Sequence, residues 1–291
     1  MPVFSVIIPL FNSSSLICLT LDSVLQQKCK DFEIIIIDDG STDDVKNILS
    51  SYIGNSSINY FYQSNSGVSA ARNKGASLSN GDYLIFLDSD DLVTQNWLFD
   101  YANIISIQNP DIIYCGINRM KDNILVEYTD PTNPFKDGIS VGNVIPGSFC
   151  IRKTFFEQLG CYDEKLAYGE NTELGFRIKH TKPTMSFVKS PNLFYNMREN
   201  SHGKNARNKM NGIIYTIKKH PQLFDKNNNL KLRFLTIAGV AALSCKEYSI
   251  AKKYFFKSLK LNPLSLKNYF RFCLVFIPVV RDFLWVNRLR K

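Results

Sequence analysis

A short acidic segment follows one of the most apolar runs in the chain. Residues 83–87 read Tyr-Leu-Ile-Phe-Leu, and residues 88–91 read Asp-Ser-Asp-Asp. A run of this kind predicts a strand that is buried on both faces. Because residues i and i+2 of an extended chain point the same way, we expect the side chains of Asp88 and Asp90 to project together.

Two carboxylates that lie this close repel each other unless a cation lies between them. Oxygen ligands favour a hard cation such as Mg²⁺ or Mn²⁺, which is usually shared with a phosphate. The carboxyl end of a buried strand is also where open α/β sheets bind their ligands. The alternative interpretation is that residues 88–91 form a polar turn that caps a helix beginning at Asp91.

Two further segments place polar residues after apolar ones. The run Phe32–Ile37 leads into a turn of small polar residues, Asp38–Asp43. A predicted helix begins at Gly67 and carries Arg72 on its first turns.

Strands and helices alternate through the first half of the chain. This alternation predicts an α/β fold with a doubly wound parallel sheet, whose buried strands should be near-continuous in Ile, Val and Leu. The serines at 13–15 are predicted to cap the first helix. The strands expected in this half are 4–8, 32–37, 58–62 and 83–87.

Beyond residue 109 the pattern weakens. Residues 121–142 are rich in Asp, Asn, Pro and Gly, which predicts loops around one short strand. We expect helices at 152–159 and 170–180. The expected strands are 111–115, 124–127, 144–151, 185–188 and 192–197.

Helical periodicity dominates from residue 201 to about 276, with breaks at 227–229 and 262–263. We therefore divide the chain into an α/β domain, residues 1–203, and a basic helical region, residues 204–291. The stretch 241–263 resembles one helix pair of a tetratricopeptide repeat. An ordinary helical hairpin explains the same stretch equally well.

Charge is divided unevenly along the chain. The formal net charge is +9, but residues 202–291 hold 19 Lys and Arg against three acidic residues, which gives +16 there and −7 in residues 1–201. Such asymmetry indicates an anionic partner, either a membrane or a nucleic acid. Few arginines and the lack of a base-reading motif argue against nucleic acid.

The last 23 residues are rich in aromatic and basic side chains. Their longest uncharged run, residues 272–280, has nine residues, whereas a transmembrane helix needs about 20. We expect an interfacial helix that binds an anionic membrane surface. Burial against the main domain is the alternative.

The seven cysteines are odd in number, and none has Cys-x-x-Cys spacing. This pattern argues against a zinc site or a disulfide framework and favours a reducing compartment. The chain opens with a strand-like run, without a basic start or a cleavage site. No signal peptide is therefore expected.

Four motifs occur in a fixed order. They are Pro9-Leu-Phe11-Asn12, Ile37-Asp-Asp39-Gly-Ser-x-Asp43, Gly67-x-Ser-x-Ala-Arg72-Asn73 and Phe86-Leu-Asp88-Ser-Asp90-Asp91. Together they resemble the nucleotide-sugar half of a family 2 glycosyltransferase, over about residues 3–200, and residues 147–177 resemble the acceptor half. The resemblance implies a Rossmann-like GT-A fold and an inverting, metal-assisted transfer of a sugar from a nucleotide-sugar, expected to be a UDP-sugar.

The resemblance also implies roles for individual residues. Asp90 would be the principal ligand of Mn²⁺ or Mg²⁺, and Asp88 would face the ribose or the metal. Arg72 would lie near the diphosphate, where a cationic fork matches phosphate oxygens. Pro9, Phe11 and Asp39 would line the base and ribose. The full donor-binding set is Pro9, Phe11, Asn12, Asp39, Arg72, Asp88 and Ser89.

Direct displacement needs a base that takes the proton of the acceptor hydroxyl. In the family a Glu-Asp pair stands at this place, with the Asp usually assigned as base, but this chain has Glu170-Asn171. An amide cannot accept that proton. We predict that Glu170 is the base. Glu173, which shares its helix face, is the second candidate, and weak or lost activity, leaving a nucleotide-sugar binding module, is the third.

The implied acceptor is a glycan or a lipid-linked glycan in surface polysaccharide synthesis. The implied location is the cytoplasmic face of the cell membrane, with peripheral attachment. A nucleotidyltransferase is a weaker alternative, because residues 11–15 lack the basic residue expected in its phosphate loop. His202 follows the last predicted strand and could reach the diphosphate or the metal.

Overall fold

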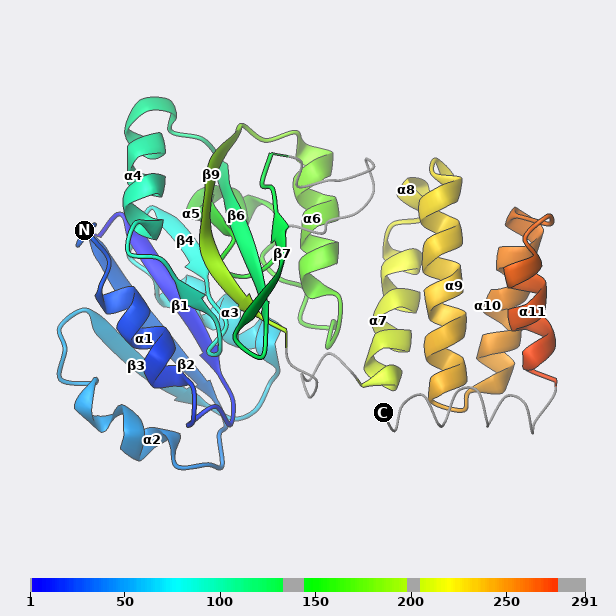
Figure 1. The fold of residues 1–291 in the computed structure, drawn as a ribbon, viewed down its shortest axis with the longest axis horizontal. Coiled ribbons are helices and arrows are strands. Elements are labelled where there is room, and N and C mark those ends of the chain that lie inside the picture. Colours follow the sequence, from blue (N-terminus) through cyan, green and yellow to red (C-terminus); the bar gives the residue numbers. More distant parts are fainter. Residues whose placement is uncertain (1, 133–143, 198–204, 277–291) are drawn as a thin grey trace. The chain divides into compact units, whose positions relative to one another are not determined.

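The computed structural model describes residues 2–132, 144–197 and 205–276. The chain divides into two compact units, one formed by residues 1–165 with 170–199 and the other by residues 166–169 with 200–291. The bar in Figure 1 runs from blue to green over most of the first unit and from yellow to red over the helices of the second.

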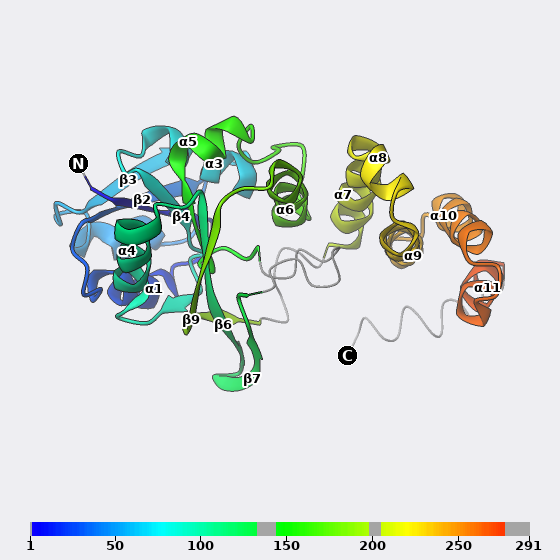
Figure 2. The same ribbon diagram turned by 90° about the horizontal axis from the view of Figure 1, so that it is seen from above.

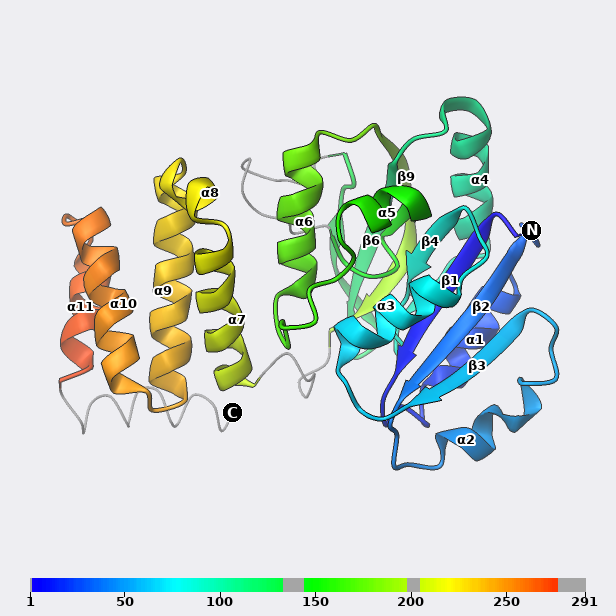
Figure 3. The ribbon, with the colours of Figure 1, turned by 180° about the vertical axis from the view of Figure 1, so that it is seen from behind.

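The first unit is built on a sheet with nine strands in the described residues, best followed in Figures 1 and 3. The strands are β1 (Phe4–Leu10), β2 (Phe32–Asp39), β3 (Ile58–Gln63), β4 (Tyr83–Phe86), β5 (Leu92–Val93), β6 (Ile112–Lys121), β7 (Ile124–Thr129), β8 (Phe149–Arg152) and β9 (Met185–Asn196). Their order is β3-β2-β1-β4-β8-β6-β9-β5, and β7 pairs with β6.

Most of this sheet is parallel. The first four strands run parallel to one another, as do β6 and β9, whereas β5, β7 and β8 are antiparallel to their neighbours. All residues of β1, β2 and β4 are buried, as expected of strands that are covered on both faces. The predicted α/β architecture with a mostly parallel sheet is thereby confirmed.

Helices cover both faces of the sheet. In Figure 2, α1 and α4 lie on one face, and α3 and α5 lie on the other. The helices of this unit are α1 (Ile17–Leu25), α2 (Val45–Ile48, continued by one 3-10 turn), α3 (Val68–Leu78), α4 (Trp97–Gln108), α5 (Lys153–Gln158) and α6 (Glu170–Thr181).

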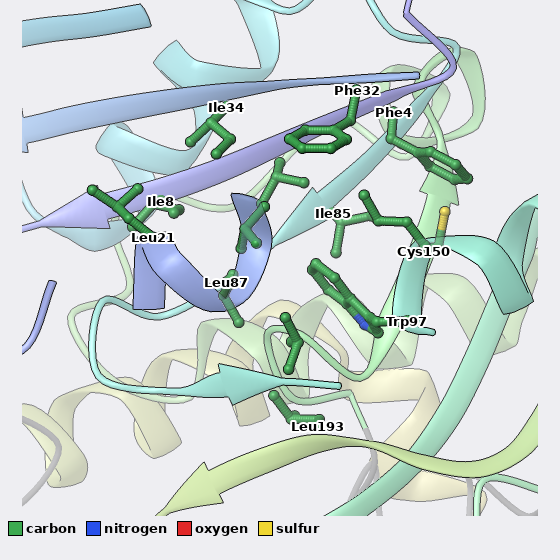
Figure 4. Packing of buried hydrophobic residues seen from close by; sticks show 14 of the residues in the cluster. Phe4, Ile8, Leu21, Phe32, Ile34, Ile85, Leu87, Trp97, Cys150 and Leu193 are labelled. Carbon is green, nitrogen blue, oxygen red and sulfur yellow. The ribbon is translucent and has the colours of Figure 1, made fainter. Parts of the chain in front are cut away.

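Alternate residues of the central strands form the core beneath α1 and α4. Figure 4 shows Ile8, Ile34 and Ile85 in this cluster, together with Leu21 and Trp97. These side chains are fully buried, and each contributes about 1.5–3 kcal/mol relative to an exposed side chain. The indole N–H of the buried tryptophan donates to the carbonyl of Gly147 at 2.9 Å.

The opposite face brings α3 close to the sheet. A Cβ on Gly75 would collide with the side chain of Ile7, so only a glycine allows α3 to approach β1 this closely. Arg72 lies three residues earlier and therefore on the same side of α3. The ring of Phe86 in β4 packs edge-on against Tyr162 at 5.1 Å, which fixes the ring of Tyr162 beside the end of that strand.

Three local predictions were wrong. Leu16, not a serine, occupies the N-cap of α1, because Ser13 and Ser14 bond within the preceding turn and to Asp43. The strands predicted at 185–188 and 192–197 are one strand, β9, with a shift of register opposite Gly116. The strand predicted at 144–151 is shorter, because residues 146–147 form a turn and β8 begins only at Phe149. The alternative interpretation, a helix that begins at Asp91, is absent as well, since β5 follows that residue and α4 begins only at Trp97.

The second unit is helical in its described part. Its helices are α7 (Ala206–Lys219), α8 (Pro221–Asp225), α9 (Asn228–Ser244), α10 (Tyr248–Leu261) and α11 (Leu266–Leu274). The predicted breaks are confirmed, because α9 begins after Asn227 and α10 ends before Asn262. Phe255 of α10 packs against α9 at Gly239, where a Cβ would meet its ring at 2.6 Å.

None of the described helices has the length and apolar content that crossing a membrane requires. The predicted interfacial tail begins inside α11, and residues 277–291 lie outside the described residues. The described part of the tail packs on α10, with Val275 buried beside Phe255.

Candidate functional site

The acidic segment after β4 is a tight turn. The amide of Asp91 donates to the carbonyl of Asp88 at 3.2 Å, which closes the turn. Asn196, at the end of β9, donates its amide to Oδ1 of Asp91 at 2.8 Å and its side chain to the carbonyl of Asp90. The extended geometry that we predicted for residues 88–90 is therefore wrong, although the segment does end a buried strand.

Arg72 links this turn to the start of α6. Its Nη2 donates to Oδ1 of Asp88 at 2.8 Å, and its Nη1 donates to Oε1 of Glu170 at 3.1 Å. The arginine side chain is 3% exposed, against 31% for Asp88 and 14% for Glu170. Three segments, namely α3, the turn after β4 and the start of α6, therefore meet at one buried guanidinium.

A second set of contacts surrounds Glu170. Asn171 donates from Nδ2 to Oε1 of Glu170 at 3.0 Å, and the hydroxyl of Tyr162 donates to Oδ1 of Asn171 at 3.0 Å. The guanidinium of Arg72 lies over the Tyr162 ring at 5.1 Å. Oε2 of Glu170 accepts no hydrogen bond from the residues that the structure describes.

Electrostatics fix the protonation of two members of this group. Burial would lower the pKa of Arg72, but Asp88, Tyr162 and Glu170 outweigh it, so the pKa is raised and the guanidinium stays charged. Burial raises the pKa of the Tyr162 hydroxyl well above its usual value, against the opposing effect of Arg72. Tyr162 is therefore a hydrogen-bond donor at neutral pH.

Asp39 ends β2 and organises the loop that precedes α3. Its Oδ1 accepts from Gln63 Nε2 at 2.7 Å and from the amide of Ser66 at 2.8 Å, and its Oδ2 accepts from the amide of Gly67 at 2.8 Å. Asp39 is 4% exposed. Its neighbour Asp38 is turned toward the amide of Ser41 and the hydroxyl of Tyr60.

The end of β1 carries the other predicted donor-binding residues. Pro9 is buried and lies opposite Ile37 in the register of β2, and Phe11 is half-buried. Asn12 has a left-handed backbone, with φ of 49°, and its Oδ1 accepts from the amides of Thr42 and Asp43. Asn12 thus ties the loop after β1 to the loop after β2.

Glu173 lies in a different environment from Glu170. Its side chain is fully buried, and both of its carboxylate oxygens accept from Arg177, at 2.7–3.0 Å. Arg177 also donates to the carbonyls of Leu159 and Cys161. The pair joins α6 to the end of α5, so Glu173 has a structural role in this arrangement.

Ser89 is buried, and Asp90 is half-buried in the turn after β4. No three His, Cys, Asp or Glu side chains gather around a possible ion within residues 2–132, 144–197 and 205–276. Asp88 and Asp90 supply only oxygen donors, and Mg²⁺ is commonly bound by one or two carboxylates together with phosphates and waters. The oxygen donors of these two residues are therefore of the kind that suits a hard cation. His202 lies outside the described residues.

Reasoning from sequence missed four residues of this site. Tyr162 and Asn73 hold each other through two bonds between the asparagine side chain and the tyrosine backbone. Gln63 donates a hydrogen bond to Asp39, and Asn196 donates to Asp91 in the acidic turn. Asn73 stands in one of the four motifs and Tyr162 in the stretch 147–177, whereas Gln63 and Asn196 stand in neither, so the motifs gave no signal for these two.

Comparison with known proteins gives a consistent result. The model of the family described as "Glycosyl transferase family 2" matches residues 5–160. An uncharacterized glycosyltransferase of Rickettsia typhi is 32% identical over 188 residues, which cover 61% of this chain and 58% of that protein. A PGL/p-HBAD biosynthesis glycosyltransferase of Mycobacterium bovis is 37% identical over 118 residues, covering 39% of this chain and 46% of that protein.

Among solved structures, Staphylococcus aureus TarS (residues 1–349) in complex with UDP-GlcNAc superposes with a TM-score of 0.66 at 18% identity, covering 97% of this chain and 88% of that one. At this identity the likeness concerns the fold. The chain matches little more than half of the length of the Rickettsia typhi relative. Because the family model covers more than half of the chain and the GT-A fold agrees, the chain belongs to glycosyl transferase family 2.

Proposed function

We propose that the protein transfers a sugar from a nucleotide-sugar, with a UDP-sugar favoured, to a glycan or lipid-linked acceptor. The observation that carries the proposal is the pairing of Arg72 with both Asp88 and Glu170. This pairing brings a candidate metal ligand and a candidate base to one place, as direct displacement requires. Family membership and the UDP-GlcNAc and UDP complexes of TarS support the choice of donor.

Asp88 and Asp90 would hold Mg²⁺ or Mn²⁺. The ion, when bound, would supply positive charge that offsets the charge developing on the departing nucleoside diphosphate. Arg72, which donates to Oδ1 of Asp88, would orient that carboxylate toward the ion. Ser89 lies between the two ligands in a turn that Asn196 holds in place.

Glu170 would act as the general base through Oε2. Oε1 already accepts from Arg72 and Asn171, so the carboxylate is held by one oxygen and presents the other. Glu173 is unsuited to this role because both of its oxygens are buried on Arg177. The base then takes the proton from the acceptor hydroxyl as that hydroxyl attacks the sugar.

Asp39 would bind the base or ribose of the donor. A carboxylate offers about four acceptor positions, and three of them are filled by Gln63, Ser66 and Gly67. One position remains for an N–H or O–H of the nucleoside. Pro9 and Phe11 would supply the apolar side of that pocket, and Asn12 would hold its rim.

Attachment to an anionic membrane would place the enzyme near a lipid-linked acceptor. Support comes from the charge of +16 in residues 202–291 and from exposed aromatic side chains on α10, on α11 and at Phe276 just beyond α11. Lysines lie over two of these rings, Lys260 over Phe256 and Lys252 over Phe276. Mixed basic and aromatic surfaces of this kind suit a membrane interface.

One experiment tests the enzymatic proposal. Donor hydrolysis and transfer are measured for a panel of UDP- and GDP-sugars with Mn²⁺, Mg²⁺ or chelator, alongside calorimetry with UDP. We expect metal-dependent turnover of a UDP-sugar. Equal UDP affinity with and without chelator would reject the metal role. UDP binding without turnover of any donor would favour the second candidate function, a nucleotide-sugar binding module, which Asn171 in place of an aspartate motivates.

A further inference from the structure

Four side chains, the candidate base Glu170 among them, form a closed ring of contacts. Arg72 and Asn171 both donate to Oε1 of Glu170, at 3.1 and 3.0 Å. Tyr162 donates to the other end of the Asn171 amide at 3.0 Å, and its own ring lies under the guanidinium of Arg72 at 5.1 Å. Each member of the ring touches two others.

The chemistry of the ring requires an amide at position 171. An ionised carboxylate only accepts hydrogen bonds, so the nitrogen of Asn171 must face Glu170. Its oxygen then faces the hydroxyl of Tyr162, which needs an acceptor. An aspartate could accept from Tyr162 but could not donate to Glu170, and it would place a second negative charge beside the first.

Tyr162 is itself held firmly. Asn73 bonds its backbone N–H at 2.9 Å and its carbonyl at 3.0 Å. The rings of Phe86 and Phe156 pack against it at 5.1 and 5.7 Å, and the residue is 2% exposed. Because Tyr162 is fixed, its hydroxyl orients the side-chain amide of Asn171. That amide in turn orients the carboxylate of Glu170.

We propose that Asn171, oriented by Tyr162, is a positioning residue that holds Glu170 with Oε2 directed to the acceptor. The inference rests on the proposed function. Asn171 then stands in place of the aspartate expected from the family, and Glu170 acts as the base. The loss of the family's Glu-Asp pair is then compensated within the same ring.

The test compares Asn171→Asp, Asn171→Ala and Tyr162→Phe with the unaltered protein. We expect Asn171→Ala to lower kcat by about 10–100-fold, since a misplaced catalytic group costs up to about 10²-fold. Tyr162→Phe should cost about 2–10-fold, the equivalent of one hydrogen bond. Donor affinity should stay unchanged in both. Tyr114→Phe, which removes a buried hydroxyl that has no partner among the described residues, is the matched control and should leave kcat unchanged.

The pH dependence of kcat separates positioning from a general loss of structure. Asn171→Asp adds a carboxylate next to Glu170, which raises the pKa of the base, so the acidic limb of the profile should move to higher pH. Wild-type or higher kcat in Asn171→Asp would overturn the proposal and favour a decayed site. If the acidic limb of the pH profile of Asn171→Asp lay at the same pH as in the unaltered protein, that result would also overturn the proposal.

A measurement of stability tests the ring without relying on turnover. Tyr162→Phe and Asn171→Ala both remove the hydrogen bond between Tyr162 and Asn171. Their effects on the free energy of unfolding should therefore be less than additive in the double variant. Additive effects would overturn the proposed ring even if the unaltered protein is active. An inactive protein with coupled variants would instead reject the proposed function and leave the ring as a structural feature.

Discussion

Arg72 is the residue that joins the acidic turn to the candidate base. Two of its nitrogens serve two different carboxylates, and its Nε, which is buried, has no hydrogen-bond partner among the described residues. A lysine could not serve both carboxylates with such fixed geometry, because its ammonium lacks the planar fork. The diphosphate-binding role implied by the family resemblance stays a prediction.

Replacing Arg72 with alanine should destabilise the protein strongly. Removing one partner of a buried ion pair costs about 3–5 kcal/mol, and we expect the lower end because Asp88 is 31% exposed. Urea unfolding measures this. The matched control is Arg207→Ala, which breaks the pair with Glu247 and should cost less than about 1 kcal/mol because Arg207 is 58% exposed. Equal losses in the two variants would contradict the account.

Asp39→Ala should have two effects. UDP affinity should fall by about 1.5–3 kcal/mol, the value of a hydrogen bond to a charged group, if the remaining acceptor position binds the nucleoside. The free energy of unfolding should fall by about 1–3 kcal/mol, because the amides of Ser66 and Gly67 and the side chain of Gln63 lose their acceptor. Calorimetry and urea unfolding measure these separately. Unchanged UDP affinity with lowered stability would make Asp39 a loop-ordering residue only.

The candidate site could be predicted from sequence only in part. The resemblance grouped Arg72, Asp88 and Glu170, although 98 residues separate the first from the last. It could not show that the guanidinium turns inward, because that depends on packing against Tyr162. The turn at Asp88 was mispredicted as extended, since Asn196, which holds the turn, lies 105 residues beyond Asp91.

At the scale of elements, the segment Leu166–Gly169 belongs to the helical unit, although it stands between residues of the sheet-bearing unit. Tyr168 packs with Ile213 of α7, and Lys209 lies over its ring at 5.7 Å. Gly212 allows this approach, because a Cβ there would collide with the carbonyl of Tyr168. Gly169, with φ of +83°, then leads the chain into α6.

Gly212→Val should loosen this segment. The new side chain must displace the Tyr168 backbone, and overpacking of this kind costs about 1–3 kcal/mol. Hydrogen exchange should become faster at residues 166–169 and along α7. Gly54→Val is the control, because a Cβ there meets nothing within 4 Å. Unchanged exchange at 166–169 in Gly212→Val would show that the segment does not depend on α7.

The regular elements were the most predictable part of the fold. Buried parallel strands are continuous apolar runs, so β1, β2 and β4 could be found from composition alone. β5 has only two residues and no pattern of its own, because it exists through pairing with β9. β9 was split in two because Pro191 interrupts the pattern, and the shift of register beside it accommodates the proline.

At the scale of the whole chain, charge separates the two halves, with −7 in residues 1–201 and +16 in residues 202–291. Truncation before residue 269 would cut α11, remove the buried side chains of Leu274 and Val275, and uncover the side chain of Phe255, with which Val275 packs. Charge reversal on exposed lysines is therefore the better probe of membrane binding. Lys257 and Lys260 of α10 suit this purpose because both are exposed.

The double variant Lys257→Glu and Lys260→Glu should bind anionic vesicles more weakly. Each basic residue near an anionic leaflet contributes about 1 kcal/mol, and the contribution falls with salt. Pelleting with vesicles that contain phosphatidylserine measures this, and neutral vesicles give the baseline. Lys46→Glu, an exposed lysine of the acidic half, is the control. Equal pelleting of the double variant and the unaltered protein would contradict membrane attachment through α10.

The central claim is that Glu170 is the base of a sugar transfer, and Glu170→Gln tests it most directly. General base catalysis contributes about 10²–10⁴-fold, so transfer should fall by that factor while UDP affinity is retained. Glu157→Gln, the same change on an exposed glutamate of α5, should leave transfer near its normal rate. Transfer by Glu170→Gln within a few-fold of the unaltered protein, at equal UDP affinity, would contradict the account.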